Sequence, residues 1–275
     1  MNYSLLFDQI KKKRSYLCIG LDVDLDKIPK HILVEEDPIF SFCKKIIDST
    51  NKYAIAYKPN IAFFETYGSK GWHSLEKVIN YLSSEYPNIF TIADAKRSDI
   101  GNTASRYAKA FFENFSFDSI TLSPYMGRDS IEPFLDFQNK YAIILALTSN
   151  EGSKDFQLTK SDGIDFYEKI IHLSKTWKNS DRIMYVVGAT NSSYLKKIRE
   201  IVPDSFLLIP GIGAQGGNLA EVSTFGMNSR CGLIVNSSRQ ILYTDNGFNF
   251  DDHAAKEAIK LQKIMENELI KFNII

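Results

Sequence analysis

The sequence predicts an α/β protein of the (β/α)8 type, the TIM barrel, folded as a single domain over residues 1–275. Short apolar runs rich in β-branched residues alternate with longer amphipathic stretches along the whole chain. The apolar runs are continuous, as expected for parallel strands covered on both faces. The length of 275 residues is ordinary for one such barrel. A doubly wound open sheet is the main structural alternative.

Eight apolar runs are predicted as strands because each is short and contains few polar residues. In chain order they cover 16–21, 54–57, 89–93, 119–122, 141–147, 183–187, 206–209 and 232–235. Between the strands, apolar residues recur at helical spacing. The helices predicted from this spacing include 40–50, 72–84, 103–114, 166–177, 193–201 and 252–270.

Composition and charge exclude several classes of function. Lys+Arg and Asp+Glu both number 33, so the formal net charge is +0 and no broad basic surface for nucleic acid or an anionic membrane is expected. No apolar run approaches membrane-spanning length. Cys18, Cys43 and Cys231 show no zinc or disulfide spacing, which predicts buried thiols and a cytoplasmic location. The histidines show no metal-ligand pattern, so no metal site is predicted.

The segment Asp94-Ala-Lys96-Arg-Ser-Asp99 directly follows the apolar run 89–93. Residues two apart in a strand share a face, so Asp94 and Lys96 are predicted to lie together, and Asp99 follows where the chain turns. At ~4 Å and an effective dielectric of about 20, each opposite charge contributes up to ~4 kcal/mol, which keeps the lysine protonated. Such a group is a fixed proton donor and a poor Schiff-base nucleophile. The alternative is a surface salt bridge, with Asp99 capping the next helix.

Polar residues follow the carboxyl end of every predicted strand, where the active sites of barrels lie. In strand order they are Asp22, Lys58, Asp94 with Lys96, Ser123-Pro124, Thr148-Ser149-Asn150, Gly188-Ala189-Thr190, the segment 210–217 and Arg239. Scattered surface salt bridges would not be expected to choose one end of each strand. The pattern therefore favours a functional interpretation of the Asp-Lys-Asp motif.

The segment 210–217, Pro-Gly-Ile-Gly-Ala-Gln-Gly-Gly, contains G-x-G-x-x-G, so dinucleotide binding is one alternative. Against it, the motif lies in the last quarter of the chain, and residues 231–236 lack the acidic residue that binds ribose. In a barrel, loops after strands seven and eight often bind phosphate through backbone N–H groups, and Arg239 could add a bidentate contact. We therefore predict a phosphorylated small-molecule ligand. Tight turns and a surface arginine are the simpler alternatives.

Together these motifs resemble orotidine 5′-phosphate decarboxylase, in particular the longer bacterial subgroup (type 2) of that family. The resemblance covers nearly the whole chain in order. It runs through Leu17-Cys-Ile-Gly-Leu-Asp22, Tyr57-Lys58-Pro59, the segment 94–100, Ser123-Pro-Tyr-Met-Gly127, Leu147-Thr-Ser-Asn150, Val187-Gly-Ala-Thr190, the segment 210–217 and Asn236-Ser-Ser-Arg239. Ser98 stands where glycine is common in the family, and Asn60 where glutamine is often seen.

The resemblance implies decarboxylation of orotidine 5′-monophosphate to UMP and CO₂ in de novo pyrimidine biosynthesis, without a metal or an organic cofactor. It implies a catalytic network of Lys58, Asp94, Lys96 and Asp99, in which Lys96 protonates the C6 carbanion. It also implies a homodimer with shared sites, in which Asp99 and Thr103 reach the neighbouring subunit's site.

The resemblance further implies the residues that contact the substrate. Asp22 and Lys58 resemble ribose contacts, and Ser149 resembles a pyrimidine contact. The phosphate end is implied to be bound by Gln215 and Arg239, with Gly216 and Gly217 shaping the loop.

Two other functions remain open. A magnesium-dependent decarboxylase or aldolase acting on a keto-sugar phosphate would need carboxylate oxygens for the metal, and Glu65 is the only rim candidate after the second strand. A non-catalytic phosphate-binding barrel would keep the glycines and Arg239 but would not need the charged network.

Overall fold

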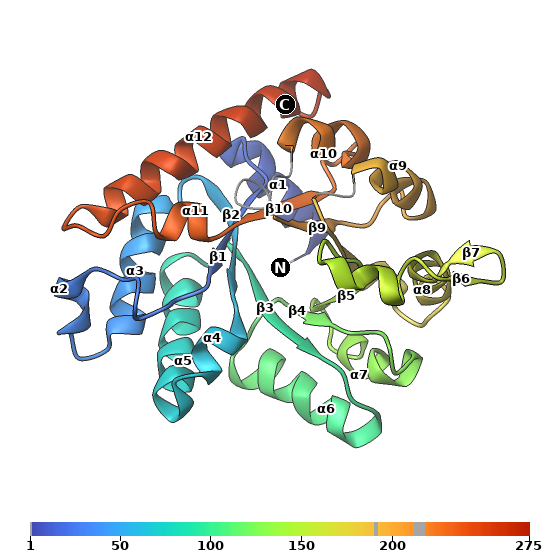
Figure 1. Cartoon of the computed structure of the whole chain (residues 1–275), viewed down its shortest axis with the longest axis horizontal. Coiled ribbons are helices and arrows are strands. Elements are labelled where there is room, and N and C mark those ends of the chain that lie inside the picture. The colour runs from blue at the N-terminus through green and yellow to red at the C-terminus, as the bar shows by residue number, and fades with distance from the viewer. Residues whose placement is uncertain (1, 190–191, 212–217) are drawn as a thin grey trace. The chain divides into compact units, whose positions relative to one another are not determined.

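A computed structural model describes residues 2–189, 192–211 and 218–275. In this part of the chain, eight strands are hydrogen-bonded in the closed order β1-β10-β9-β8-β5-β4-β3-β2 (Figure 1). The strands are β1 (Leu17–Leu21), β2 (Ala54–Pro59), β3 (Phe90–Arg97), β4 (Ser119–Leu122), β5 (Tyr141–Leu147), β8 (Ile183–Val187), β9 (Leu207–Pro210) and β10 (Leu233–Ser237). Each corresponds to a predicted strand, and closure excludes the open sheet. The (β/α)8 fold class is confirmed.

The burial of the strands explains why they could be predicted from the sequence. Every residue of β1, β2, β4, β8 and β10 is buried, as parallel strands covered on both faces require. Strand β3 extends beyond the predicted run 89–93 to Arg97, so Asp94 and Lys96 lie in its carboxyl-terminal half, in agreement with the strand position assumed for them. Two local features were not predicted. Residues 160–165 form a small antiparallel hairpin, β6 (Lys160–Ser161) with β7 (Ile164–Asp165). The helix predicted at 103–114 is an α-helix followed by a π-helix.

Contacts within the chain group into two compact units, whose boundaries fall inside β3, after Ala95, and inside β10, after Val235. The first unit comprises residues 1–95, 115–117 and 236–275, and the second comprises 96–114 and 118–235. The single-domain expectation therefore stays a prediction.

In the first unit, helices α3 and α12 pack on each other, and α12 also contacts β1 (Figure 1). The rings of Phe42 and Phe250 stack at 5.2 Å between these helices. Local signals start two of the helices: Asn2 caps α1 by accepting from Leu5 N–H, and Asp37 caps α3. The helices are α1 (Tyr3–Lys13), α2 (Lys30–Leu33), α3 (Pro38–Thr50), α4 (Ile61–Glu65), α5 (Gly68–Glu85), α11 (Arg239–Leu242) and α12 (Phe250–Lys271).

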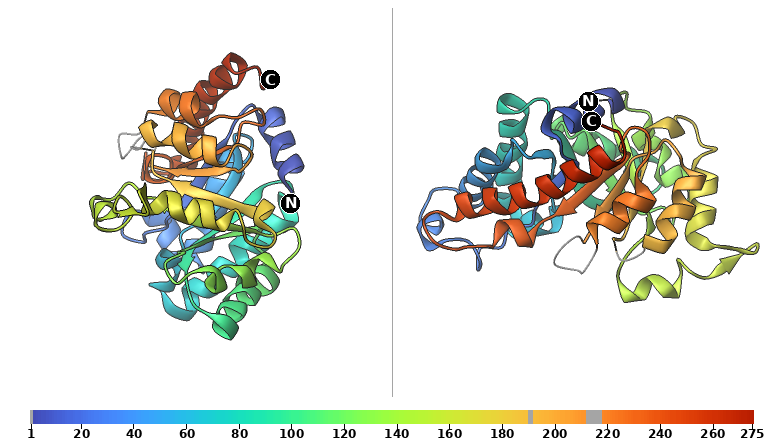
Figure 2. Two further views of the ribbon diagram at one scale, coloured as in Figure 1. Left: turned by 90° about the vertical axis from the view of Figure 1, so that its right-hand side faces the viewer. Right: turned by 90° about the horizontal axis from the view of Figure 1, so that it is seen from above.

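In the second unit, α9 packs on α10, and the β6–β7 hairpin extends beside α8 (Figure 2). Asn218 caps α10 by accepting from the N–H groups of Ala220 and Glu221. The α-helices are α6 (Gly101–Lys109), α7 (Glu132–Leu135), α8 (Phe166–Ser174), α9 (Ser192–Ile201) and α10 (Leu219–Gly226). The π-helix is η1 (Ala110–Asn114), and the 3₁₀ turns are η2 (Arg128–Ser130), η3 (Glu151–Asp155) and η4 (Ser180–Arg182).

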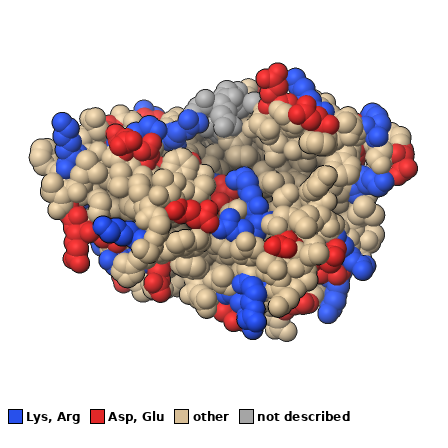
Figure 3. Space-filling model, turned by 60° about the horizontal axis from the view of Figure 1, so that its bottom comes forward, with Lys and Arg blue, Asp and Glu red and all other residues tan. Residues whose placement is uncertain are grey.

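The structure bears on three expectations from composition. Cys18, Cys43 and Cys231 are buried and unpaired with one another, as predicted. No helix in the described part of the chain has the length and apolar character needed to cross a membrane. On the face shown in Figure 3, acidic and basic side chains are interspersed, so this face carries no broad surface of one charge.

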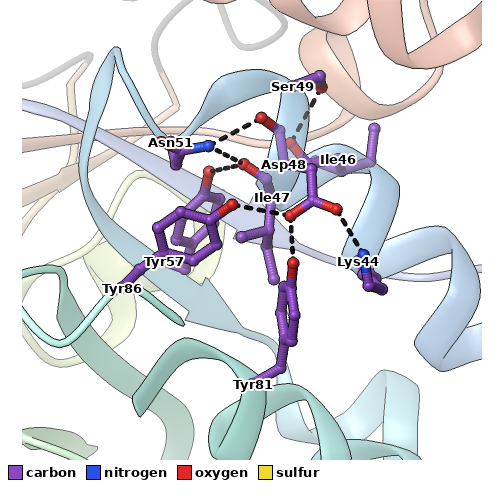
Figure 4. Close-up of polar contacts among 9 residues, drawn as sticks. All are labelled: Lys44, Ile46, Ile47, Asp48, Ser49, Asn51, Tyr57, Tyr81 and Tyr86. Carbon is purple, nitrogen blue, oxygen red and sulfur yellow. Dashed lines mark hydrogen bonds and ion pairs between the residues drawn. The ribbon is translucent and has the colours of Figure 1, made fainter. Parts of the chain in front are cut away.

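A polar cluster around Asp48 joins the ends of α3 and α5 (Figure 4). The Asp48 carboxylate accepts hydrogen bonds from the hydroxyls of Tyr81, at 2.5 Å, and Tyr86, at 2.9 Å. It also accepts from Lys44 Nζ at 2.7 Å. Partial burial alone would raise the pKa of Asp48, but these three hydrogen bonds outweigh burial and lower it below its ordinary value. The ionised carboxylate therefore stabilises the fold.

Replacing Asp48 with Ala should lower the free energy of unfolding by about 1–2 kcal/mol at pH 7, a figure discounted for the partial exposure of the carboxylate. Because the folded-state pKa is depressed, this stabilisation is present above the unfolded pKa of 3.8 and is lost as the pH falls through the folded value. Urea unfolding should therefore show a difference at pH 7 that shrinks below pH 3.8.

The control is Asp8→Ala, which removes one exposed ion pair, to Lys11 at 3.1 Å on α1. This variant should lose less than about 0.5 kcal/mol. Equal losses in the two variants would contradict the role assigned to the Asp48 cluster.

Candidate active site

The first unit holds a buried ion pair at the carboxyl ends of β2 and β3. Lys58 Nζ lies 2.6 Å from Asp94 Oδ2, and the two side chains are 5% and 11% exposed. Strands β2 and β3 run parallel, and a further bridge joins Asn60 to Asp94 beyond their regular pairing. The parallel register therefore brings the two predicted rim residues together, as expected for strand ends on one rim.

Electrostatics keeps Lys58 charged despite its burial. Burial by itself lowers the pKa of this lysine, but the charges of Asp94 and then Asp22 outweigh burial and raise the pKa above its ordinary value. Lys58 is therefore an ammonium at neutral pH. The neighbouring Cys18 thiol is fully buried, and burial raises its pKa to about 12, so it is no nucleophile.

Polar atoms gather where β1 and β10 end, also in the first unit. Gly20 approaches Ser238 so closely that a Cβ on residue 20 would lie 2.8 Å from the Ser238 Cβ, and Ser238 Oγ donates to the Gly20 carbonyl at 3.1 Å. Asp22 Oδ1 and Asn236 Oδ1 are buried and have no hydrogen-bond partner in the described part of the chain. Arg239 follows as the exposed first residue of α11. Buried acceptors thus lie together at this rim, with Arg239 next to them in sequence, as a polar ligand requires.

The Asp-Lys-Asp motif enters the second unit at Lys96, whose side chain is exposed. The backbone there is left-handed, with φ of 47°, which interrupts the extended geometry behind the prediction that Asp94 and Lys96 share a face. Lys96 N–H donates to Thr121 Oγ1 at 2.9 Å, and Arg97 C=O accepts from Ser123 N–H at 2.9 Å. Strand β4 therefore holds the unusual turn.

The remaining predicted residues of the second unit lie near strand and helix ends. Asp99 Oδ1 accepts from the Ile100 N–H at 2.7 Å, but the N-cap of α6 is Ile100, so the expected alternative of Asp99 as the cap is wrong. Thr103 is exposed in the first turn of α6. Ser149 is half-buried after β5, and a Cβ at Gly188 would lie 2.8 Å from its backbone nitrogen.

The predicted site residues fall into three groups. The first unit holds Asp22, Lys58, Asp94 and Arg239, and the second holds Lys96, Asp99, Thr103 and Ser149. The predicted phosphate residues Gln215, Gly216 and Gly217 lie outside the described residues. Among the residues that the structure describes, no three His, Cys, Asp or Glu side chains are grouped as a metal site requires.

Two residues at these strand ends were missed by the sequence analysis. Thr121 is buried in β4 and supports the Lys96 backbone, and its signal was a hydroxyl within an apolar run. Tyr243 contacts the backbone of Asp22 from more than two hundred residues away, and no local pattern indicates such a pairing.

The fold and the charged residues at its strand ends are those of a (β/α)8-barrel enzyme, in which the active site lies at the carboxyl ends of the strands. The profile of the family described as orotidine 5′-phosphate decarboxylase / HUMPS matches residues 15–247. The orotidine 5′-phosphate decarboxylase of Flavobacterium johnsoniae is 60% identical over 265 residues, which cover 96% of this chain and 97% of that protein. That of Christiangramia forsetii is 58% identical over 266 residues, covering 97% and 98%.

Solved structures agree with these sequence matches. The OMP decarboxylase of Leishmania donovani superimposes with a TM-score of 0.82 at 33% identity, covering 97% of this chain and all of that one. The UMP synthase of the same organism superimposes with a TM-score of 0.83 at 35% identity, and the match covers 96% of this chain and 56% of that chain. The chain belongs to the orotidine 5′-phosphate decarboxylase / HUMPS family.

Replacing Lys58 with Met should lower the free energy of unfolding by roughly 3–5 kcal/mol at pH 7, because Asp94 and Asp22 lose a buried ammonium. Because the folded-state pKa of Lys58 is raised above its unfolded value of 10.5, this stabilisation is fully present below pH 10.5 and is lost only as the pH rises through the folded value. Urea unfolding of both proteins should therefore show the same loss at pH 7 and at pH 9.

The control is Lys77→Met, because Lys77 pairs with Asp37 at 3.1 Å but is 37% exposed. It should lose about 1 kcal/mol or less. A Lys58→Met loss no larger than that of the control would show that Lys58 is not electrostatically essential to the fold.

Proposed function

We propose that this chain decarboxylates orotidine 5′-monophosphate to UMP and CO₂, as a step of pyrimidine biosynthesis. The observation that carries the proposal is the buried Lys58–Asp94 ion pair, with Lys96 two residues further along the same strand. The family membership and the names of the relatives, at 52–60% identity, support the same activity. A cytoplasmic location stays a prediction.

The proposed reaction leaves charge on carbon. The bond between C6 and the carboxylate breaks, CO₂ departs, and the electron pair remains on C6. The Lys96 ammonium then donates a proton to C6, and the neutral amine recovers a proton from water. Asp94 would lie beside the departing carboxylate, which disfavours the ground state, although preorganised positive charge is the better-founded contribution.

The buried pair suits this chemistry because it is charged before substrate arrives. Asp94 and Asp22 hold Lys58 as a cation, and the protein requires no reorganisation there when negative charge develops. We assign Lys58 and Asp22 to the ribose, in accordance with the buried Asp22 Oδ1, which has no hydrogen-bond partner among the described residues. Asp99 completes the proposed charged network.

The proposed binding residues extend from the base to the phosphate. Ser149, after β5, is assigned to the pyrimidine. Arg239, at the start of α11, is assigned to the phosphate, where its guanidinium can make a bidentate contact. Gln215, Gly216 and Gly217, which follow β9 in the sequence, are proposed as the remaining phosphate contacts. Contacts at the phosphate align the distant C6 for reaction.

We also propose a homodimer in which Asp99 and Thr103 reach the partner's site. Apolar side chains near this segment are exposed: Ile100 at 49%, Tyr125 at 76% and Met126 at 46%. The Ser123–Arg97 backbone hydrogen bond joins the loops that carry them. Exposed apolar side chains beside polar ones are typical of an interface between subunits.

The proposal predicts turnover in metal-free buffer. Purified protein should convert orotidine 5′-monophosphate to UMP in excess EDTA. The reaction is measured by the loss of substrate absorbance. Lys96→Ala should lower kcat by a factor of at least about 10³, because it removes the proton donor and a preorganised charge. UMP binding by calorimetry should change far less.

A different outcome would identify one of the rivals. Activity abolished by EDTA and restored by magnesium would favour a metal-dependent member of the family. Normal turnover by Lys96→Ala would remove the proposed role of that residue. Phosphate-ligand binding without turnover by the wild-type protein would indicate a non-catalytic barrel.

The shared-site proposal predicts complementation between inactive variants. Lys96→Ala and Asp99→Ala proteins, mixed and allowed to exchange subunits, should form hybrids in which one of the two sites keeps both residues. With random exchange, half of the dimers are hybrids, so about one quarter of the wild-type activity should return. Exchange is checked by native mass spectrometry. Confirmed exchange without recovered activity would mean that each subunit supplies its own Asp99.

A further inference from the structure

We propose that Tyr243 is a positioning residue for the substrate, acting through Asp22. Its hydroxyl holds the backbone at Asp22 against the end of helix α11, the helix that begins with Arg239. This inference rests on the proposed function, since it concerns how the assigned ribose and phosphate contacts are held in place.

The contact uses both hydrogen-bonding capacities of one hydroxyl. Tyr243 Oη donates to the Asp22 carbonyl at 2.6 Å and accepts from the Asp24 N–H at 2.8 Å. Burial raises the pKa of Tyr243, so the phenol is protonated and remains a donor at neutral pH. The hydroxyl therefore closes the chain around residue 23 into a fixed turn directly after β1.

The ring is held independently of the hydroxyl. It stacks on Phe42 at 6.1 Å with an interplanar angle of 14°, and Phe42 stacks in turn on Phe250 of α12. Tyr243 N–H donates to the Arg239 carbonyl at 3.1 Å, so the same residue also ends α11. The ring and backbone of Tyr243 are thus fixed together with helix α11, which begins at Arg239. The hydroxyl reaches from there to the turn after β1 that contains Asp22.

Asp22 needs this support because the attraction of Lys58 does not by itself set the direction of the carboxylate. Its Oδ1 is buried and has no hydrogen-bond partner in the described part of the chain. A carboxylate left available to a ligand takes its position from its backbone, and small errors of position are costly at a binding site. A second hydroxyl supports the same loop further on, where Tyr67 accepts from the Leu25 N–H at 3.0 Å. The Tyr243 contact is the one that reaches Asp22 itself.

The test is the single substitution Tyr243→Phe, which keeps the ring stacking and removes only the oxygen. We expect kcat/KM for orotidine 5′-monophosphate to fall roughly tenfold, mostly through KM, and UMP affinity to fall by a similar factor. Tyr81→Phe is the matched control. It also removes one phenol oxygen, from the Asp48 cluster, and should leave both constants unchanged within about twofold.

A double-mutant cycle separates positioning from general support of the fold. In an Asp22→Ala background, the carboxylate that Tyr243 is proposed to position is absent although the backbone carbonyl remains, so Tyr243→Phe should then change UMP affinity by less than about twofold. The kcat/KM values and UMP affinities are measured at a temperature below the unfolding transition of each variant, so a loss of stability is not mistaken for a loss of binding.

Two results would overturn the inference. One is a Tyr243→Phe enzyme with wild-type kcat/KM and UMP affinity. The other is a loss of UMP affinity on substituting Tyr243→Phe that is equally large in the wild-type protein and in the Asp22→Ala variant. Failure of the proposed function is distinguishable, because the wild-type protein itself would then not turn over orotidine 5′-monophosphate.

Discussion

The site depends on one buried ammonium, that of Lys58, and on the carboxylates that keep it charged. An isolated lysine at this depth would lose its proton, and isolated aspartates would take one up. Asp94 at 2.6 Å and Asp22 nearby reverse that tendency. The ends of three neighbouring strands are therefore fixed by mutual attraction, and the charges are present before any ligand binds. A reaction that creates negative charge on carbon benefits from such an arrangement.

The order of the strands places these charges without specialised loops. Strand β2 lies between β1 and β3, so Asp22 after β1, Lys58 in β2 and Asp94 in β3 come from three successive neighbours in the barrel. Strand β10 lies on the other side of β1 and brings Asn236 and Ser238 beside Gly20, and Arg239 follows in sequence. Lys58 and Asp94 lie within β2 and β3 themselves, and groups on strands are held more accurately than groups on loops. The divergent chemistry of barrels rests on the same separation between a packed core and a polar rim.

Sequence reasoning predicted the fold well because the strands are covered on both faces, and continuous apolar runs record that burial directly. It also placed Lys58 and Asp94 at one rim, since parallel strands share an end. It did not predict the left-handed backbone of Lys96, because that conformation depends on the hydroxyl of Thr121, which is distant in sequence. The bond between Tyr243 and Asp22 escaped for the same reason. The local periodicity of apolar residues does not indicate which segments distant in sequence contact each other in the fold.

The left-handed φ of 47° at Lys96 has a consequence for how this position can vary. A residue with a Cβ in that conformation costs roughly 1–2 kcal/mol relative to an ordinary backbone, whereas glycine is nearly free of this penalty. Selection for thermal robustness alone would favour glycine or asparagine here. A lysine here therefore gives up folding energy that glycine would keep, and under the proposed function that is the cost of placing the proton donor at this position.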